Sequence, residues 1–269
     1  MLPGVPGPSV APWSLSFVGR PRWKGPAMND RTLDLGLRTG NLLLDALDED
    51  ERALMLADSV SRPIEVGNTL FRPGDEIGYV AFPTRGTLSM LAQPNESTPV
   101  EAATVGREGA ASVHSALGSR RASQELVCQI DGEMITVGIE RFAKQAQDGR
   151  LQALVYGYLE ALVVQISLSA ACNAVHHLNQ RCARWLLQTH DRVDSDTFGL
   201  TQEYLGIMLG VQRPSVSIAQ QSLQTAGCIT FHRGTITITD REGLEAVACP
   251  CYEMIRAEYS RLVPLHIQR

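Results

Sequence analysis

The 269-residue chain has no uninterrupted run of about eighteen apolar residues, the length that a membrane-spanning helix needs. Its six cysteines form no Cys-x-x-Cys pair, so the ligand spacing of zinc ribbons and iron–sulfur proteins is missing. The sequence shows neither a phosphate-binding loop nor a nucleophile–base pattern, and its net charge of −5 excludes a uniformly basic surface. These absences predict a non-enzyme without catalytic residues, metal, cofactor or membrane segment, in the reducing cytoplasm.

Acidic residues are absent from one long segment, although the chain as a whole is acidic. No Asp or Glu occurs between Glu203 and Asp240. A surface that approaches the phosphates of DNA must avoid carboxylates, because each one repels the phosphate charge. The segment therefore favours a local DNA-binding surface over the alternative, an ordinary helical hairpin in a protein core.

The same segment has the start, stop and turn residues that are typical of a helix-turn-helix followed by a hairpin. Thr201 is a suitable N-cap, Gly210 can end a first helix, and Pro214 suits the first turn of a second helix. We expect this recognition helix at about Arg213–Ala226, and a wing hairpin turning at Arg233-Gly234. The residues expected to contact DNA are Thr201, Gln202, Gln212, Arg213, Ser215, Ser217, Gln220, His232 and Arg233.

The N-terminal half of the chain has a different character. Residues 1–30 are rich in proline and lack periodicity, which predicts a disordered extension. Residues 64–139 consist of short β-type runs separated by turn residues, which predicts an antiparallel roll within a domain of residues 31–150. The side chains expected to fill its interior are Val80, Phe82, Leu88, Met90, Val127, Ile135 and Val137.

A long amphipathic helix should connect the two halves, within residues 151–178. Apolar residues alternate there by four and three, as in a coiled-coil seam. The predicted seam of a homodimer is Leu154, Tyr158, Ala161, Gln165, Leu168, Cys172 and Val175. A second stripe, which includes Leu151 and Val155, would face the roll; the alternative is one broad core face inside a monomer. Residues 179–269 would then hold the winged helix-turn-helix and a last helix interrupted at Pro250.

Two short motifs allow a chemical role beside a structural one. The only closely spaced cysteines are Cys249 and Cys251, for which packed thiols on a terminal helix are the simpler interpretation, with a redox or metal role as the alternative. The adjacent His176 and His177 would point to different helix faces, so they are not expected to share a metal.

The order of roll, long helix and winged helix-turn-helix resembles the Crp/Fnr family of bacterial transcription regulators. The most specific segments are LFRPGDEIGYVAFPTRGTLSML and LTQEYLGIMLGVQRPSVSIAQQSLQTAGCI. The resemblance implies an α+β protein whose effector-binding, jelly-roll-like β-roll controls two recognition helices in a dimer. It also implies a palindromic operator on double-stranded DNA, with RNA polymerase as a further candidate partner.

The chain departs from the family at both sites. Pro214 and Ile218 replace the Glu and the second Arg with which many members read bases, so a different operator is expected. In the effector region Arg107 stands where cyclic-AMP-binding members have a carboxylate. Glu108, Arg121 and Ala122 are the other candidate pocket residues. This pattern disfavours a cyclic nucleotide, and no other effector is indicated.

The sequence thus predicts a homodimeric, sequence-specific DNA-binding regulator. The alternative is a small-molecule or thiol-based redox sensor, with weak affinity for DNA.

Overall fold

The computed structural model describes residues 38–93 and 99–263, and the predicted disordered extension of residues 1–30 lies outside them. Two short helices come first, α1 (Leu42–Asp45) and α2 (Glu49–Leu56). Five strands form the N-terminal sheet: β1 (Val60–Ile64), β2 (Thr69–Phe71), β3 (Tyr79–Ala92), β4 (Val100–Val105) and β5 (Glu125–Gly138). Two more helices, α3 (Val113–Ala116) and α4 (Ile139–Gln145), lie beside this sheet.

The sheet is antiparallel throughout its paired strands, as predicted. Its order is β1-β5-β3-β4, with β2 paired to β5. The two long strands β3 and β5 run side by side over most of their length, and bulges bend them where Arg85 and Thr87 interrupt the register. The bends curl the sheet around a core that contains Val80, Phe82 and Ile135. The predicted α+β class with an N-terminal antiparallel roll is confirmed.

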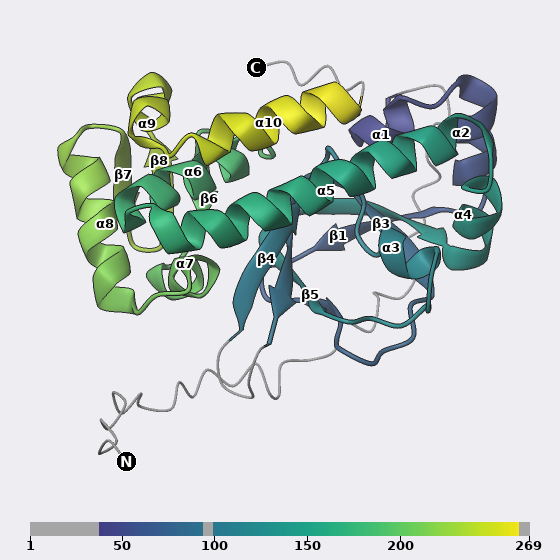
Figure 1. Cartoon of the computed structure of the whole chain (residues 1–269), viewed down its shortest axis with the longest axis horizontal. Helices are drawn as coiled ribbons and strands as arrows, with labels where there is room; N and C mark the ends of the chain where they lie inside the picture. Colours follow the sequence, from purple (N-terminus) through teal and green to yellow (C-terminus); the bar gives the residue numbers. More distant parts are fainter. Residues whose placement is uncertain (1–37, 94–98, 264–269) are drawn as a thin grey trace, which may run out of the picture.

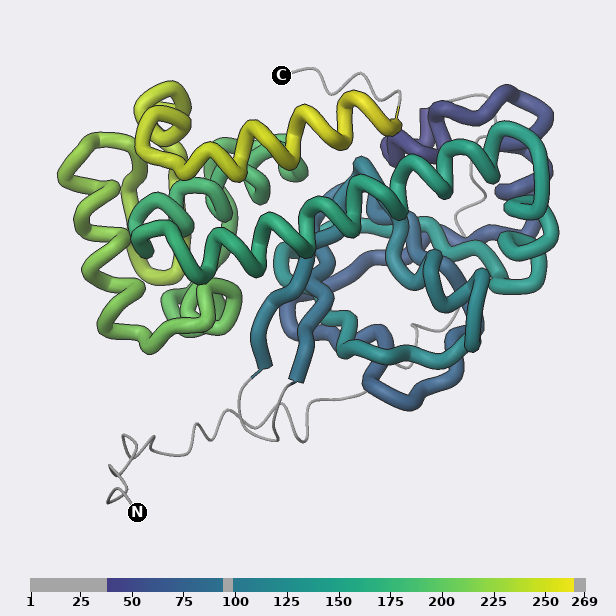
Figure 2. Tube along the Cα trace, in the orientation of Figure 1, coloured from purple at the N-terminus to yellow at the C-terminus, as the bar shows by residue number. Residues whose placement is uncertain are grey.

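A single long helix, α5 (Gly149–Val175), runs from the roll to the C-terminal domain (Figures 1 and 2). The last helix, α10 (Cys251–Leu262), lies along it. The two backbones approach closely at Gly157, where a Cβ atom would lie 2.3 Å from the carbonyl oxygen of Leu262. Among the described residues, α5 is the one helix long and apolar enough to cross a membrane by length and composition. In the structure it packs against the roll and α10.

The C-terminal domain is a winged helix. It consists of α6 (Leu178–His190), β6 (Thr197–Gly199), α7 (Gln202–Leu209), α8 (Arg213–Thr225), β7 (Ile229–His232), β8 (Thr235–Ile238) and α9 (Arg241–Val247). The three strands form a small sheet of order β6-β8-β7. Trp185, Leu186 and Val216 lie in its core. The predicted winged helix-turn-helix is confirmed, and Pro250 separates α9 from α10 as expected.

The roll and the winged helix share one hydrophobic cluster. Leu91, Val127 and Ile130 of the roll pack with the core of the C-terminal domain, and Leu91 and Val127 have no exposed surface. Val127 was predicted to fill the roll's own interior. It packs instead on the opposite face of the sheet, because alternate residues of β5 point to opposite sides and both sides are covered.

Polar contacts fix the same junction. The indole Nε1 of Trp185 on α6 donates to Oε1 of Glu101 on β4 at 2.9 Å, and the Ser89 hydroxyl donates to Oε2 at 2.7 Å. Burial raises the pKa of Glu101 to about 7, although both hydrogen bonds act in the opposite direction. This carboxyl therefore changes its charge near neutral pH at the contact between the two domains.

A second polar contact is fully buried. Glu108 follows β4, and its Oε1 accepts hydrogen bonds from Nε of Arg192 at 2.9 Å and from the backbone N–H of Gly106 at 3.1 Å. Burial alone would lower the pKa of Arg192, but the charge and hydrogen bond of Glu108 outweigh it and raise that pKa. Arg192 follows α6, so this ion pair joins the two domains.

Removing the charge of Glu108 should destabilise the protein strongly. In Glu108→Gln the guanidinium of Arg192 stays buried without a counter-charge, and breaking a buried pair in this way costs about 3–5 kcal/mol. Urea unfolding followed by circular dichroism measures the loss. The control is Glu133→Gln, which removes the exposed pair with Arg85 and should cost less than about 1 kcal/mol. Equal losses in the two variants would contradict the assigned role of the buried pair.

The raised pKa of Glu101 predicts a pH-dependent stability. Because the pKa in the folded state lies above the ordinary value of 4.5, the contribution of this group is complete below that value and is lost as pH rises through about 7. Glu101→Gln keeps an oxygen for Trp185 and does not ionise. Relative to the native chain, the variant should therefore gain about 1–3 kcal/mol between acidic and mildly alkaline pH. Melting temperatures of both proteins across this range test it, and a constant difference would show that Glu101 does not titrate there.

Candidate nucleic-acid interface

Helices α7 and α8 form the predicted helix-turn-helix. The Thr201 hydroxyl caps α7 by accepting from the N–H of Tyr204, and α7 ends at Gly210, whose φ of 64° is left-handed. Pro214 lies in the first turn of α8, where a missing N–H costs nothing. Val216, Ala219 and Leu223 bury one face of α8 against the domain. The opposite face is left for a partner.

The outward face of α8 is uncharged except at its start. Gln212, Arg213, Pro214, Ile218 and Gln221 are exposed, and the Ile218 side chain is 71% exposed. Nε of Arg213 donates to Oε1 of Gln202 at 3.3 Å, which holds the guanidinium beside the start of α7. An isoleucine this exposed at the centre of the outward face contributes little to packing among the described residues.

Three of the predicted contact residues are less accessible. Gln220 is only 2% exposed, and its Oε1 accepts from Nε2 of Gln202 at 2.9 Å. Gln220 therefore connects α7 and α8, and its prediction as a base contact is wrong. The neighbouring Gln221 is exposed. Ser217 is half-buried, and its hydroxyl donates to the Arg213 carbonyl four residues earlier. Ser215 is also half-buried.

The wing follows directly after α8. Strands β7 and β8 are joined by Arg233 and Gly234, both with positive φ (47° and 80°), as a tight two-residue hairpin turn requires. His232 and Arg233 are exposed at this tip, and Thr201 is exposed at the start of α7. The predicted phosphate-contacting residues thus lie at helix and hairpin ends, with the exposed face of α8 between them in the sequence.

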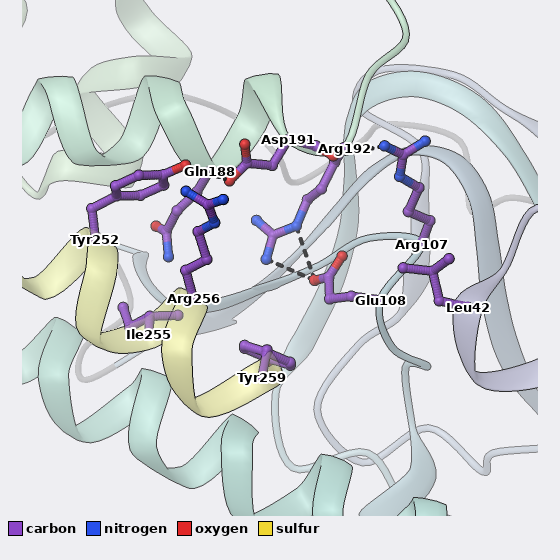
Figure 3. Close-up of a pocket in the computed structure, with 10 residues that line it drawn as sticks. All are labelled: Leu42, Arg107, Glu108, Gln188, Asp191, Arg192, Tyr252, Ile255, Arg256 and Tyr259. Carbon is purple, nitrogen blue, oxygen red and sulfur yellow. Dashed lines mark hydrogen bonds and ion pairs between the residues drawn. The ribbon is translucent and has the colours of Figure 1, made fainter. Parts of the chain in front are cut away.

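The predicted effector residues do not share one cavity. Arg107 and Glu108 line a pocket between the roll, the end of α6 and α10 (Figure 3), together with Leu42, Gln188, Asp191, Arg192, Tyr252, Ile255, Arg256 and Tyr259. Arg107 pairs with the exposed Asp194 beside the pocket at 3.1 Å, and Glu108 pairs with Arg192 inside it. Because Glu108 pairs with Arg192 and links the two domains, its carboxylate is not free to bind a ribose.

A second pocket lies in the roll, and Ala122 lines it while Arg121 does not. The Arg121 guanidinium instead donates to the carbonyl of Gly74. Glu125 contributes a buried carboxylate, which accepts from the Thr69 hydroxyl at 3.1 Å. The described residues that line this pocket include no arginine or lysine, so it has a negative group where a phosphate would need a positive one.

The predicted dimer seam is largely wrong. Leu154, Tyr158, Ala161, Gln165 and Cys172 are buried within the chain itself, and Leu168 is half-buried. The Tyr259 hydroxyl of α10 donates to Oε1 of Gln165 at 2.7 Å, and the rings of Tyr158 and Tyr259 lie 6.3 Å apart. Of the predicted seam, Val175 alone is exposed. The spacing correctly marked an apolar stripe, but α10 and the roll cover it.

A different face of α5 is open. It repeats by three and four residues along the helix, through Ala153, Tyr156, Glu160, Val163, Ser167, Ala170 and Ala174, all of which are exposed. Tyr156 and Val163 are 59% and 61% exposed. We call these seven residues the outer seam. Apart from Tyr156 and Val163 its members are small or polar, so no continuous stripe of large apolar side chains marks the outer seam in the sequence.

Comparison with known proteins agrees with this architecture. Residues 180–247 match the model of the Crp-like helix-turn-helix domain. No curated protein sequence matches the chain. The predicted resemblance to the Crp/Fnr family is confirmed, and the described helix-turn-helix and wing lie within the matched segment.

Solved structures extend the match in fold to the roll. A transcriptional regulator of the Crp/Fnr family from Eubacterium rectale is 17% identical with a TM-score of 0.56, over 78% of this chain and 99% of that one. A CRP-family regulator from Thermus thermophilus is 16% identical with a TM-score of 0.59, over 70% and 96%. FixK2 from Bradyrhizobium japonicum is 15% identical with a TM-score of 0.58, over 71% and 98%. The chain has the fold of Crp/Fnr transcription regulators.

Proposed function

We propose that the protein is a homodimeric transcription regulator that reads a palindromic DNA site with α8. The observation that carries the proposal is the exposed, acid-free face of α8 inside a Crp-like helix-turn-helix domain. A recognition helix of this class lies in the major groove with its first residues at the base edges. Arg213 is the first residue of α8 and the natural partner of a guanine.

Ile218 supplies the second element of readout. It has no hydrogen-bonding group, so on a base edge it contacts only the methyl group of thymine. The exposed Gln212 and Gln221 can hydrogen-bond adenine or a phosphate. The wing residues His232 and Arg233, with Thr201, hold the backbone. We therefore expect half-sites that contain a guanine and a thymine at fixed spacing.

Dimerisation through the outer seam would bring two α8 helices to the same DNA. Alternating spacing of three and four along α5 matches the contact line of two supercoiled helices, and small residues such as Ala153, Ala170 and Ala174 permit close approach. A twofold axis through this seam gives the protein the symmetry of a palindrome. Work on chromosomal DNA would place the protein in the cytoplasm.

The proposal includes no cyclic-nucleotide effector. The acidic roll pocket at Glu125 and the occupied Glu108 oppose a cyclic nucleotide. Because neither of these two sites suits a cyclic nucleotide, we infer a regulator that binds DNA without an added nucleotide. Selection of sites from random duplex DNA by the purified protein tests this; a palindrome with half-sites about one helical turn apart is expected, and recovery of DNA without an enriched sequence would refute it.

Arg213 and Arg233 should have different effects on specificity. Arg213→Ala should cost about 1–3 kcal/mol on the selected site and relax the preference at one base pair per half-site. Arg233→Ala, on the wing, should weaken binding to all sequences about equally and reduce the salt dependence. Fluorescence anisotropy on the selected site and on single-base variants measures both. Uniform weakening by Arg213→Ala would remove this residue from base readout.

A charge in the outer seam should separate the protomers. Val163→Glu places two carboxylates face to face at the centre of the proposed interface, so a monomer with weakened binding to the palindrome is expected. Glu253→Ala, on the exposed side of α10, is the control and should leave the oligomeric state unchanged. Analytical ultracentrifugation gives the answer, and a Val163→Glu dimer as stable as the native one would place the interface elsewhere.

A further inference from the structure

Four side chains that are distant in the sequence meet at the end of α5. They are Cys172, His176, Cys249 and Cys251, and their sulfur and nitrogen atoms all lie within 4.8 Å of one another. Sγ of Cys172 and Sγ of Cys249 are 3.4 Å apart, and Sγ of Cys251 lies 3.6 Å from Nδ1 of His176. The three cysteines are buried and the histidine is half-buried. We call these four residues the hinge cluster.

We propose that the hinge cluster is a structural Zn²⁺ site. Zinc in structural sites takes four thiolate and imidazole ligands in a tetrahedron, with about 2.3 Å to sulfur and about 2.0–2.1 Å to nitrogen. Such bond lengths place the ligand atoms about 3.5–3.8 Å from one another. The separations of 3.4 Å and 3.6 Å are close to this spacing, and rotation of the side chains about χ1 can shorten the longest separation.

The spacing fits one ion better than an iron–sulfur cluster. The ligands of a cluster bind different irons, so they surround a larger volume than four atoms within 4.8 Å enclose. A set of three thiolates and one imidazole, without a carboxylate, also selects a thiophilic ion over magnesium or calcium.

The charges around the hinge cluster suit a metal thiolate centre. Three thiolates on Zn²⁺ leave one net negative charge, which needs compensation when it is buried. Arg181 and Arg184, on α6, interact electrostatically with Cys172. Nε of each is buried and has no hydrogen-bond partner among the described residues. Burial raises the pKa of the Cys251 thiol, and the positive end of the α10 helix dipole opposes that rise because Cys251 is the first residue of α10.

The position of the hinge cluster gives the metal a mechanical role. Cys172 lies in the last turns of α5 and His176 is the C-cap residue, while Cys249 precedes α10. Only His176 and His177 separate α5 from α6, the first helix of the winged domain. A metal ion bound here would connect α5 to Cys249 and Cys251, the residues on either side of Pro250 between α9 and α10. It would thereby fix the orientation of the winged domain relative to α5.

Only a weak signal for this site is visible in the sequence. Cysteine and histidine four residues apart share one face of a helix, and Cys-x-Cys is a close ligand pair. Neither a Cys-x-x-Cys pair nor the two adjacent histidines mark this site, and a metal role for Cys249 and Cys251 was only the alternative, because Cys172 and His176 meet them only in the fold.

Metal content of the full-length protein tests the proposal without DNA. Protein purified under reducing conditions and dialysed against metal-free buffer should retain about one zinc per chain, measured by mass spectrometry of the elements. After removal of zinc, added Co²⁺ should produce the sulfur-to-metal charge-transfer bands and the d–d absorption bands of a tetrahedral thiolate site. A folded native chain that holds no zinc and gives no such spectrum overturns the proposal.

Two variants with matched controls locate the ion. Cys251→Ser and His176→Asn should lose zinc and weaken cobalt binding by more than the about 10–100-fold that loss of an outer-shell partner costs. Cys228→Ser, a buried thiol of the winged domain, and His177→Asn, the adjacent histidine, should keep both. Zinc retained at the native level by His176→Asn and Cys251→Ser would place the metal elsewhere and overturn the assignment.

Thiol chemistry is the competing result. If Cys172 and Cys249 instead form a disulfide, mass spectrometry of the unreduced protein shows a cross-linked peptide pair, and the reduced protein binds no cobalt. This combination refutes the zinc site. Circular dichroism of every variant shows whether loss of metal is caused by loss of the fold. Because His176 is half-buried, its substitution is the one least expected to unfold the chain.

Discussion

The buried pair of Glu108 and Arg192 is the contact on which the relation between the two domains depends. A buried ion pair adds little net stability compared with an apolar contact, because both charges lose their hydration. Its effect is on arrangement: if either domain moves, a charge is left buried without its partner. Gly106 admits the pair, and Gly109 admits the ring of Tyr158 on α5. A Cβ at Gly106 would lie 2.4 Å from Cδ of Arg192, and one at Gly109 would lie 2.3 Å from the Tyr158 ring. The Val-Gly-Arg-Glu-Gly segment therefore serves packing between domains.

Helix α5 connects this junction with the proposed dimer. The roll and α10 bury two sides of the helix, and Tyr259 and Gln165 join them by a hydrogen bond. The outer seam, by contrast, is exposed and available to a second copy. A partner on that seam would rest on a helix that is already anchored to both domains, so the position of each recognition helix would follow from the geometry of one chain. The hinge cluster adds a second anchor at the other end of α5.

Local sequence patterns predicted much of the fold and part of the interface. Thr201, Gly210 and Pro214 start or end a helix through contacts within one or two turns of the chain, so their effect does not depend on distant residues. The same holds for the wing turn at Arg233. Because one face of α8 must be apolar to pack, the periodicity of apolar residues also predicted which residues lie on its outward face. Arg213 is one of these exposed residues. Gln220 was misplaced because it lies at the edge between the two faces, where contact with Gln202 decides its burial.

What the sequence determined by itself was therefore the kind, order and polarity of the elements, including an acid-free segment suited to DNA. Tertiary structure alone decided what covers each apolar stripe and which distant side chains meet. The stripe through Leu154 and Tyr158 could face a partner or the same chain, and the docking of α10 resolved this. Cys172 and His176 gained Cys249 and Cys251 as neighbours only because α10 returns along α5. Periodicity records the direction of a side chain from its own helix, whereas the partner in that direction is set by packing between elements far apart in the chain.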